Sequence, residues 1–182
     1  MNKYIALLRG INISGKNKVP MAELKNEFEH LGYEDVSTYL NSGNVIFKSS
    51  INDKVTISEC IHKMVEDKFG ISVPIYIIKS SELEELLANQ PSWWGTEDKA
   101  IYDNIIFIIS PYTYKDVYIA MGEPNEKLEK AEEYKNCIFW SYDLKNYRKT
   151  NWWAKTASTS ISDFITIRTA NTMRKVLEIC NK

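Results

Sequence analysis

Basic and amide side chains gather near the N-terminus, in a polar loop that joins an apolar run to a helical pattern. Residues 4–18 read YIALLRGINISGKNK, and Pro20 opens the helical pattern that follows. Glycines let backbone amides approach a ligand, and the amides of a helix N-terminus favour anions. The stretch predicts an anion-binding loop with the candidate ligand residues Arg9, Gly10, Asn12, Gly15, Lys16 and Lys18. The alternative is that the glycines serve only turn geometry and the lysines are solvated. Asn17 follows Lys16 where a nucleotide-binding P-loop needs serine or threonine.

Two further stretches offer polar groups to a ligand. Asn41-Ser42-Gly43-Asn44 is most simply a hairpin turn, and the alternative is that Ser42 and Asn44 reach the ligand of the first loop. Residues 147–155, YRKTNWWAK, interleave basic side chains with aromatic ones. This composition is typical of a surface that stacks on nucleobases and pairs with phosphates. Adjacent tryptophans are more simply core and lid contacts. The candidate residues in the C-terminal part are Lys155, Arg168 and Asn171. Arg168 and Asn171 would flank the start of the last helix, where Thr169 or Asn171 could instead be a simple cap.

Charge is distributed unevenly along a chain whose net charge is only −1. Residues 82–133 hold twelve acids and four bases, whereas residues 145–182 hold eight bases and two acids. The two regions could pair in the fold, or the basic region could meet an anionic partner. The small net charge argues against a dedicated nucleic-acid binder.

Cysteine and histidine usage excludes several classes of site. Cys60, Cys137 and Cys180 are far apart and odd in number, as expected of buried thiols in a reducing compartment. There are two histidines and no Cys-x-x-Cys pair, so we expect no metal site and no cofactor. Neither a signal peptide nor a membrane-spanning run is present in these 182 residues. We expect a cytoplasmic protein without a membrane partner, and the sequence leaves its oligomeric state open.

Hydrophobic periodicity predicts the elements that must position these residues. Strand-like runs at 3–8, 36–40, 45–48 and 73–79 alternate with amphipathic helices at 20–31 and 57–69. This β-α-β-β-α-β order predicts a ferredoxin-like unit, a four-stranded antiparallel sheet with both helices on one face. A short helix is expected at 81–87, with Glu84 completing a capping box. Residues 89–99 are either a joint between halves or a loop lying over one of them.

The second half repeats the same order. Strands are expected at 104–109, 127–134, 137–142 and 165–167, and helices at 115–121, 152–164 and 172–179. The fold class predicted is α+β, with two tandem ferredoxin-like units and a C-terminal helix. The predicted domains are residues 1–80 and 81–182, and a tandem duplication is the economical explanation.

Neither an RNA-recognition domain nor a familiar catalytic constellation matches well. In the first half, only Tyr4 and Phe47 are candidates for base stacking. No GxSxG motif occurs, and the paired carboxylates Glu84-Glu85 and Glu132-Glu133 lie on polar faces.

Three segments resemble a bacterial family of uncharacterised proteins, domain of unknown function 1697. They are YIALLRGINISGKNKVPMAELK, TYLNSGNVIF and TIRTANTMRKVLEI, which together span nearly the whole chain. The chain departs from the family at Thr169-Ala170, where an asparagine and an aromatic are usual, and at Ala154-Lys155, the nearest match to a serine-lysine pair. The resemblance implies a tandem ferredoxin-like fold and no established reaction.

These observations lead to two main hypotheses. The first is a binding module that holds an anionic small molecule with a phosphate group, or less favourably a nucleic-acid backbone. The second is an enzyme, such as a transferase or hydrolase acting on a phosphorylated small molecule between the halves. In it, Arg9 and Lys16 would stabilise developing charge. A homo-oligomeric interaction scaffold is a third alternative.

Overall fold

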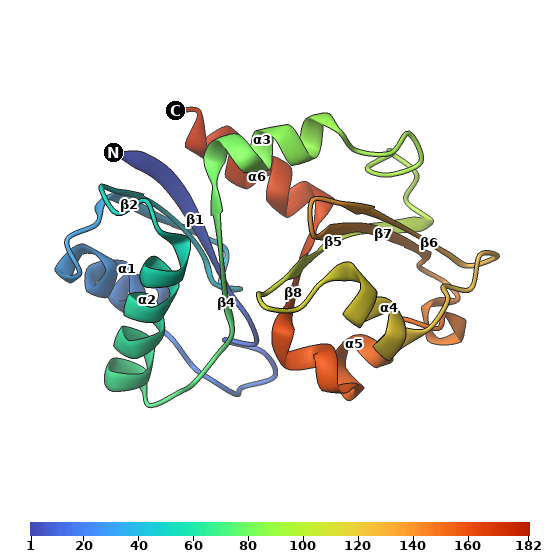
Figure 1. Cartoon of the computed structure of the whole chain (residues 1–182), viewed down its shortest axis with the longest axis horizontal. Coiled ribbons are helices and arrows are strands. Elements are labelled where there is room, and N and C mark those ends of the chain that lie inside the picture. Colours follow the sequence, from blue (N-terminus) through green and yellow to red (C-terminus); the bar gives the residue numbers. More distant parts are fainter. The chain divides into compact units, whose positions relative to one another are not determined.

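The computed structural model describes all 182 residues and divides the chain into two compact units (Figure 1). The first unit comprises Met1–Glu84 and Val176–Lys182, and the second unit comprises Glu85–Lys175. Each unit carries one four-stranded antiparallel sheet, which confirms the predicted α+β class. No helix of the structure combines the length and the apolar character needed to cross a membrane.

The first unit is built around strand β1 (Asn2–Leu8), whose last five residues are buried. The strand order is β2-β3-β1-β4, and every neighbouring pair is antiparallel. The partner strands are β2 (Glu34–Tyr39), β3 (Asn44–Ser49) and β4 (Ile75–Lys79). A strand buried on both faces needs a continuous apolar run, which YIALL supplies.

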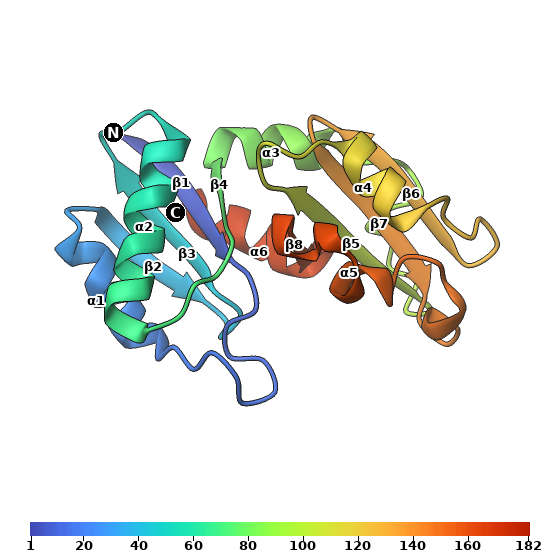
Figure 2. The ribbon, with the colours of Figure 1, turned by 60° about the horizontal axis from the view of Figure 1, so that its bottom comes forward.

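Helices α1 (Met21–His30) and α2 (Lys54–Phe69) pack on one face of this sheet (Figure 2). Their apolar residues recur at helical spacing and meet Tyr4, Ala6 and Leu8 of β1 in one core. Helix α2 begins after Asp53, whose carboxylate accepts hydrogen bonds from the backbone N–H groups of Val55 and Thr56.

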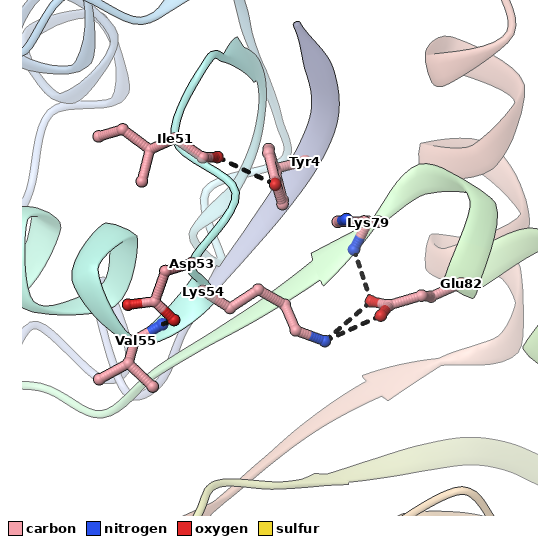
Figure 3. Close-up of polar contacts among 7 residues, drawn as sticks. All are labelled: Tyr4, Ile51, Asp53, Lys54, Val55, Lys79 and Glu82. Atoms are coloured by element: carbon pink, nitrogen blue, oxygen red, sulfur yellow. Dashed lines mark hydrogen bonds and ion pairs between the residues drawn. The ribbon is translucent and has the colours of Figure 1, made fainter.

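Polar contacts join the start of α2 to the start of helix α3 (Ser80–Ala88) within the first unit (Figure 3). The carboxylate of Glu82 accepts a 2.9 Å hydrogen bond from the Lys79 backbone N–H and pairs with Lys54 Nζ at 2.9 Å. The helix therefore begins one residue earlier than the sequence predicts. Glu82, the third helical residue, holds the capping position that the sequence pattern assigns to Glu84. Nearby, the buried Tyr4 hydroxyl donates to the Ile51 carbonyl.

The second unit has the strand order β6-β7-β5-β8, again antiparallel throughout. Its strands are β5 (Ile101–Ile108), β6 (Glu129–Tyr134), β7 (Cys137–Asp143) and β8 (Ile165–Thr169). Helix α4 (Tyr114–Met121) contributes Val117 and Met121 to a core with Ile106, Trp140 and Trp152. Thr113 and Asp116 form a capping box at the start of α4.

Residues 89–99 form a loop that lies over the sheet of the second unit, which is one of the two alternatives that their sequence leaves open. Trp94 is 1% exposed and packs edge-on against Phe139, with ring centroids 4.9 Å apart. Its indole N–H donates a 2.7 Å hydrogen bond to the Asn104 carbonyl. Arg174, on helix α6 (Ala170–Cys180), lies over the indole and donates to the Gly95 carbonyl. Phe139 alternates with the helix-facing Ile138 and Trp140, so Trp94 covers the opposite face of the sheet.

The prediction of one continuous helix at 152–164 is wrong. The structure has α5 (Lys155–Ser158) and a 3-10 helix η2 (Ser160–Phe164), with Thr159 in an extended conformation between them. Hydroxyl groups compete for the helical carbonyls here, because Thr159 Oγ1 donates to Lys155 O and Ser158 Oγ donates to Ala154 O. Helical periodicity alone did not reveal this competition.

Candidate functional site

Asn12 organises the loop between β1 and α1, which is the first candidate site. Its side-chain amide donates to the Val19 carbonyl at 2.8 Å and accepts from the Val19 N–H at 2.8 Å. The same amide donates a 3.0 Å hydrogen bond to the Asn41 carbonyl in the β2–β3 turn. Asn12 has φ +56°, a left-handed conformation that asparagine tolerates better than most residues. One side chain thus closes the loop and ties it to the neighbouring turn.

The tip of the loop, residues 12–17, is closed by its own backbone hydrogen bonds. The Asn12 N–H donates to Asn17 O at 3.0 Å, and the Lys16 N–H donates to Ile13 O at 2.9 Å. The Asn17 side chain donates to Gly10 O at 3.0 Å. Gly15 has φ +77°, which suits glycine at this tight reversal. Lys16 and Lys18 are exposed, so the loop presents two cations on an internally bonded frame.

The β2–β3 turn lies against this loop. The Leu8 N–H donates to Gly43 O at 2.9 Å, and a Cβ added to Gly43 would lie 2.9 Å from atoms of both Leu8 and Ile11. Asn44 is fully buried, and its amide donates to Tyr39 O and to Ser42 Oγ. Glycine at position 43 therefore permits the close approach of two segments that are far apart in the sequence.

The structure joins the two segments that carry the candidate residues of the first unit, namely Arg9, Gly10, Asn12, Gly15, Lys16 and Lys18 in the loop and Ser42 and Asn44 in the turn. Within this set the roles differ. Asn12 and Asn44 direct their amides into backbone carbonyls, so they hold the site in shape. Lys16 and Lys18 extend from the exposed part of the loop and are the groups placed to meet an anion.

The remaining candidates, Lys155, Arg168 and Asn171, belong to the second unit. Lys155 Nζ donates a 2.6 Å hydrogen bond to Met121 O, a carbonyl at the end of α4, where cations are favoured by the helix dipole. Arg168 is 8% exposed and donates to Thr166 Oγ1 and to Ile167 O. Asn171 is exposed in the first turn of α6 and lines a hollow of about 500 Å³.

Sequence patterns indicated neither that hollow nor a second one in the first unit. The first hollow is lined by residues 95–99 and 101–103 and by residues at the start of α6, including Arg174. The other, of about 580 Å³, lies between α1 and α2 and is lined by Leu31, Cys60, Met64 and charged residues. Neither could be found from the sequence, because each combines residues from segments that only the fold brings together.

The aromatic and carboxylate groups considered for base stacking or catalysis are engaged in contacts that hold the fold. Tyr4 and Phe47 are fully buried and stack on each other in the helix-facing core, so neither is accessible to a base. The Lys135 ammonium beside Glu85 lowers the pKa of that carboxyl, whereas a general acid at neutral pH needs a raised pKa. No group of three or more His, Cys, Asp or Glu side chains is placed to hold a metal ion.

Comparisons with known proteins place the chain among uncharacterised bacterial proteins. Residues 1–139 match the family model described as a protein of unknown function, DUF1697. The solved structure of the conserved bacterial protein SP0830 from Streptococcus pneumoniae is similar, with a TM-score of 0.84 and 30% sequence identity. That similarity covers 98% of each chain. No curated protein matches the chain.

Proposed function

This chain belongs to the DUF1697 family of proteins of unknown function, and we propose that it is a binding module for a phosphate-bearing ligand. The proposed site is the first loop, residues 9–18, together with the β2–β3 turn. The observation that carries the proposal is the hydrogen bond from Asn12 to the Asn41 carbonyl, because it joins the two predicted polar segments. The ligand class is a nucleotide, a sugar phosphate or a nucleic-acid backbone.

The charge of the loop supports an anionic ligand. Lys16 and Lys18 are exposed on the loop, and Arg9 lies where the loop leaves β1. Ammonium and guanidinium groups form the strongest hydrogen bonds to phosphate oxygens, because the attraction between opposite charges adds to the bond. Helix α1 begins directly after the loop, and its N-cap, Pro20, has no side-chain cap. The amides of the first turn would therefore add to the attraction for an anion.

The frame of the loop supports binding by a prearranged site. Asn12 and Asn17 each bond backbone carbonyls within the loop, so part of the entropy of ordering is already lost in the free protein. A site that is ordered before binding loses less entropy when the ligand arrives. We assign Lys155 and Arg168 structural roles instead, because Lys155 caps α4 and Arg168 is buried.

We infer further that both units are ferredoxin-like domains related by tandem duplication. The strand orders β2-β3-β1-β4 and β6-β7-β5-β8 support this, since equivalent strands hold equivalent places. Helices α1 and α4 follow the first strand of each unit, as that topology requires.

A thermal-shift titration tests the proposed site. The probes are inorganic phosphate, adenosine monophosphate and glucose 6-phosphate, with chloride at the same ionic strength as a reference. A ligand that binds only the folded state stabilises it by RT ln(1 + [L]/Kd), so the midpoint of unfolding rises as the ligand concentration exceeds Kd. We expect at least one phosphate probe to raise the midpoint, and Lys16→Glu to abolish the rise.

The matched control is Lys63→Glu, which reverses an exposed lysine of the same unit that pairs with Asp67. It should keep the response to phosphate. If both variants lost the phosphate response equally, the loss would reflect the change in net charge and not a site at Lys16. A response that Lys16→Glu leaves intact, or no response to any probe, would contradict the proposal.

A further inference from the structure

The second unit carries an aromatic and basic surface made of the half-buried Tyr147 and the exposed Lys145, Arg148, Lys149 and Trp153, which we call the Trp153 surface. The two adjacent tryptophans of this segment have opposite surroundings. Trp152 is fully buried, and its indole N–H donates to Gly122 O at 2.8 Å. Trp153 is 40% exposed, a large fraction for the residue type with the greatest apolar area. Core packing therefore explains Trp152, whereas Trp153 contacts the Tyr147 ring and the Tyr142 side chain and still keeps a large part of its surface exposed.

The aromatic rings of this surface are arranged together. The Tyr147 and Trp153 rings meet edge to face, with centroids 4.6 Å apart and planes inclined by 67°. The Arg148 guanidinium lies 5.5 Å from the Tyr147 ring centroid, and its Nε donates to the Tyr147 hydroxyl at 2.9 Å. Arg148 and Trp153 thus both contact Tyr147, and Trp153 is the exposed aromatic ring of the group.

Thr150 fixes the backbone that carries both rings. Its hydroxyl donates a 2.7 Å hydrogen bond to Tyr147 O and accepts one of 3.3 Å from the Trp153 N–H. Thr150 itself is buried, at 8% exposure. Before Tyr147, the Asp143 carboxylate accepts from the Asn146 N–H at 2.7 Å and stabilises the 3-10 helix η1 (Tyr147–Lys149). The aromatic pair is therefore held in place by buried or half-buried polar groups.

The charged side chains of the segment itself have one sign, and the bordering carboxylates of Asp143 and Glu129 accept hydrogen bonds from the backbone N–H groups of Asn146 and Asn151. Residues 144–155 contain four bases and no acid. One of the four, Lys155, is used to cap α4, whereas Lys145, Arg148 and Lys149 are exposed. The surface therefore complements a ligand that has both negative charge and flat apolar groups.

We propose that the Trp153 surface binds single-stranded nucleic acid, with a base stacked on Trp153 and phosphates paired with Lys145, Arg148 and Lys149. Bases stack on aromatic side chains in a sequence-tolerant way, and lysine and arginine follow the backbone. An acidic peptide would pair with the lysine and arginine side chains of the surface, but it would leave the exposed indole without a stacking partner. This site lies wholly in the second unit and is independent of the proposed phosphate site on the first loop.

The test is fluorescence anisotropy of labelled 15-nucleotide oligo(dT) and oligo(rU) with the full chain, at about 50 and 200 mM salt. The wild-type chain should bind one or both oligonucleotides, and binding should weaken as salt rises because counterions are released. Trp153→Ala should weaken binding at least about fivefold, while Trp153→Phe should keep most of it. Arg148→Ala and Lys149→Ala should each lower the affinity and reduce the salt slope by about 0.7.

The matched control is Lys115→Ala, which removes an exposed lysine elsewhere in the second unit and should leave binding unchanged. A 15-residue poly-glutamate competitor distinguishes nucleic acid from any polyanion. No binding at 50 mM salt, or binding that Trp153→Ala and Arg148→Ala both leave intact, would overturn the proposal. Equal competition by poly-glutamate and by unlabelled oligonucleotide would also overturn it. Loss of oligonucleotide binding in Lys16→Glu alone would assign the nucleic acid to the first loop instead.

Discussion

The side-chain amide of Asn12 donates a 3.0 Å hydrogen bond to the backbone carbonyl of Asn41, across 29 residues of sequence. This bond joins the loop after the first strand to the turn of the following hairpin. The same side chain bonds both the N–H and the carbonyl of Val19. Asn12 is therefore the residue on which the shape of the proposed phosphate site depends most directly.

Replacing Asn12 should loosen the loop and destabilise the first unit. Asn12→Ala removes the side-chain hydrogen bonds to Val19 and Asn41, and we expect the free energy of unfolding to fall by about 1–3 kcal/mol. Urea denaturation measures the change. Asn17→Ala is the matched control, since Asn17 also has a positive φ and bonds one loop carbonyl, that of Gly10. Equal losses in the two variants would mean that the additional bonds of Asn12 to Val19 and Asn41 do not stabilise the fold.

Gly43 should be far less tolerant of alanine than Gly15, although both have φ near +80°. Positive φ alone costs an alanine roughly 1 kcal/mol, which is our expectation for Gly15→Ala. The added methyl at Gly43 would also lie 2.9 Å from Leu8 Cβ and Ile11 Cδ1, whereas at Gly15 it meets nothing within 4 Å. Overpacking adds about 1–3 kcal/mol at Gly43. Thermal unfolding of Gly43→Ala and Gly15→Ala measures the difference. Similar midpoints for the two variants would contradict the close approach of Gly43 to Leu8 and Ile11.

Glu129 should be a principal polar contributor to the second unit. Its side chain is 3% exposed and accepts hydrogen bonds from the backbone N–H groups of Asn125, Asn151 and Trp152 and from the Trp140 indole. Glu129→Gln replaces one acceptor by a donor facing these N–H groups. We expect it to lower the free energy of unfolding by about 2–4 kcal/mol in urea. Glu132→Gln, an exposed position on the same strand, should change it by less than about 0.5 kcal/mol. An equally small effect at Glu129 would refute the role assigned to it.

Two buried tyrosines should make stability fall at high pH. Burial raises the pKa of Tyr33 and the pKa of Tyr142 to about 12. Because the folded pKa lies above the unfolded value of about 10, the contribution to stability is complete below pH 10. It is lost as the pH rises from about 10 to 12. We expect urea unfolding between pH 9 and 11.5 to show this decline, and Tyr33→Phe with Tyr142→Phe to flatten it. An unchanged slope in the double variant would contradict the assignment.

The sequence by itself determined the elements whose signals are local. Apolar runs indicated the strands, and helical spacing with Gly70 as a stop indicated α2, whose Gly70 has φ +66° at the C-cap. Polar residues between glycines also identified the first loop as the most site-like segment. Local signals were less reliable where side chains compete with the backbone. The hydroxyls of Ser158 and Thr159 bond helical carbonyls, and the predicted helix at 152–164 is broken there.

Only the tertiary structure decided which groups meet. The Asn12–Asn41 bond, the close approach of Gly43 to Ile11 and the bonds from Trp140 and Asn151 to Glu129 all join segments distant in sequence. The same holds for the different surroundings of Trp152 and Trp153, which the adjacent letters WW do not reveal. The reason is physical. Backbone preference and periodicity act over a few residues, whereas burial and hydrogen-bond partnership depend on packing between elements that the chain brings together only when it folds.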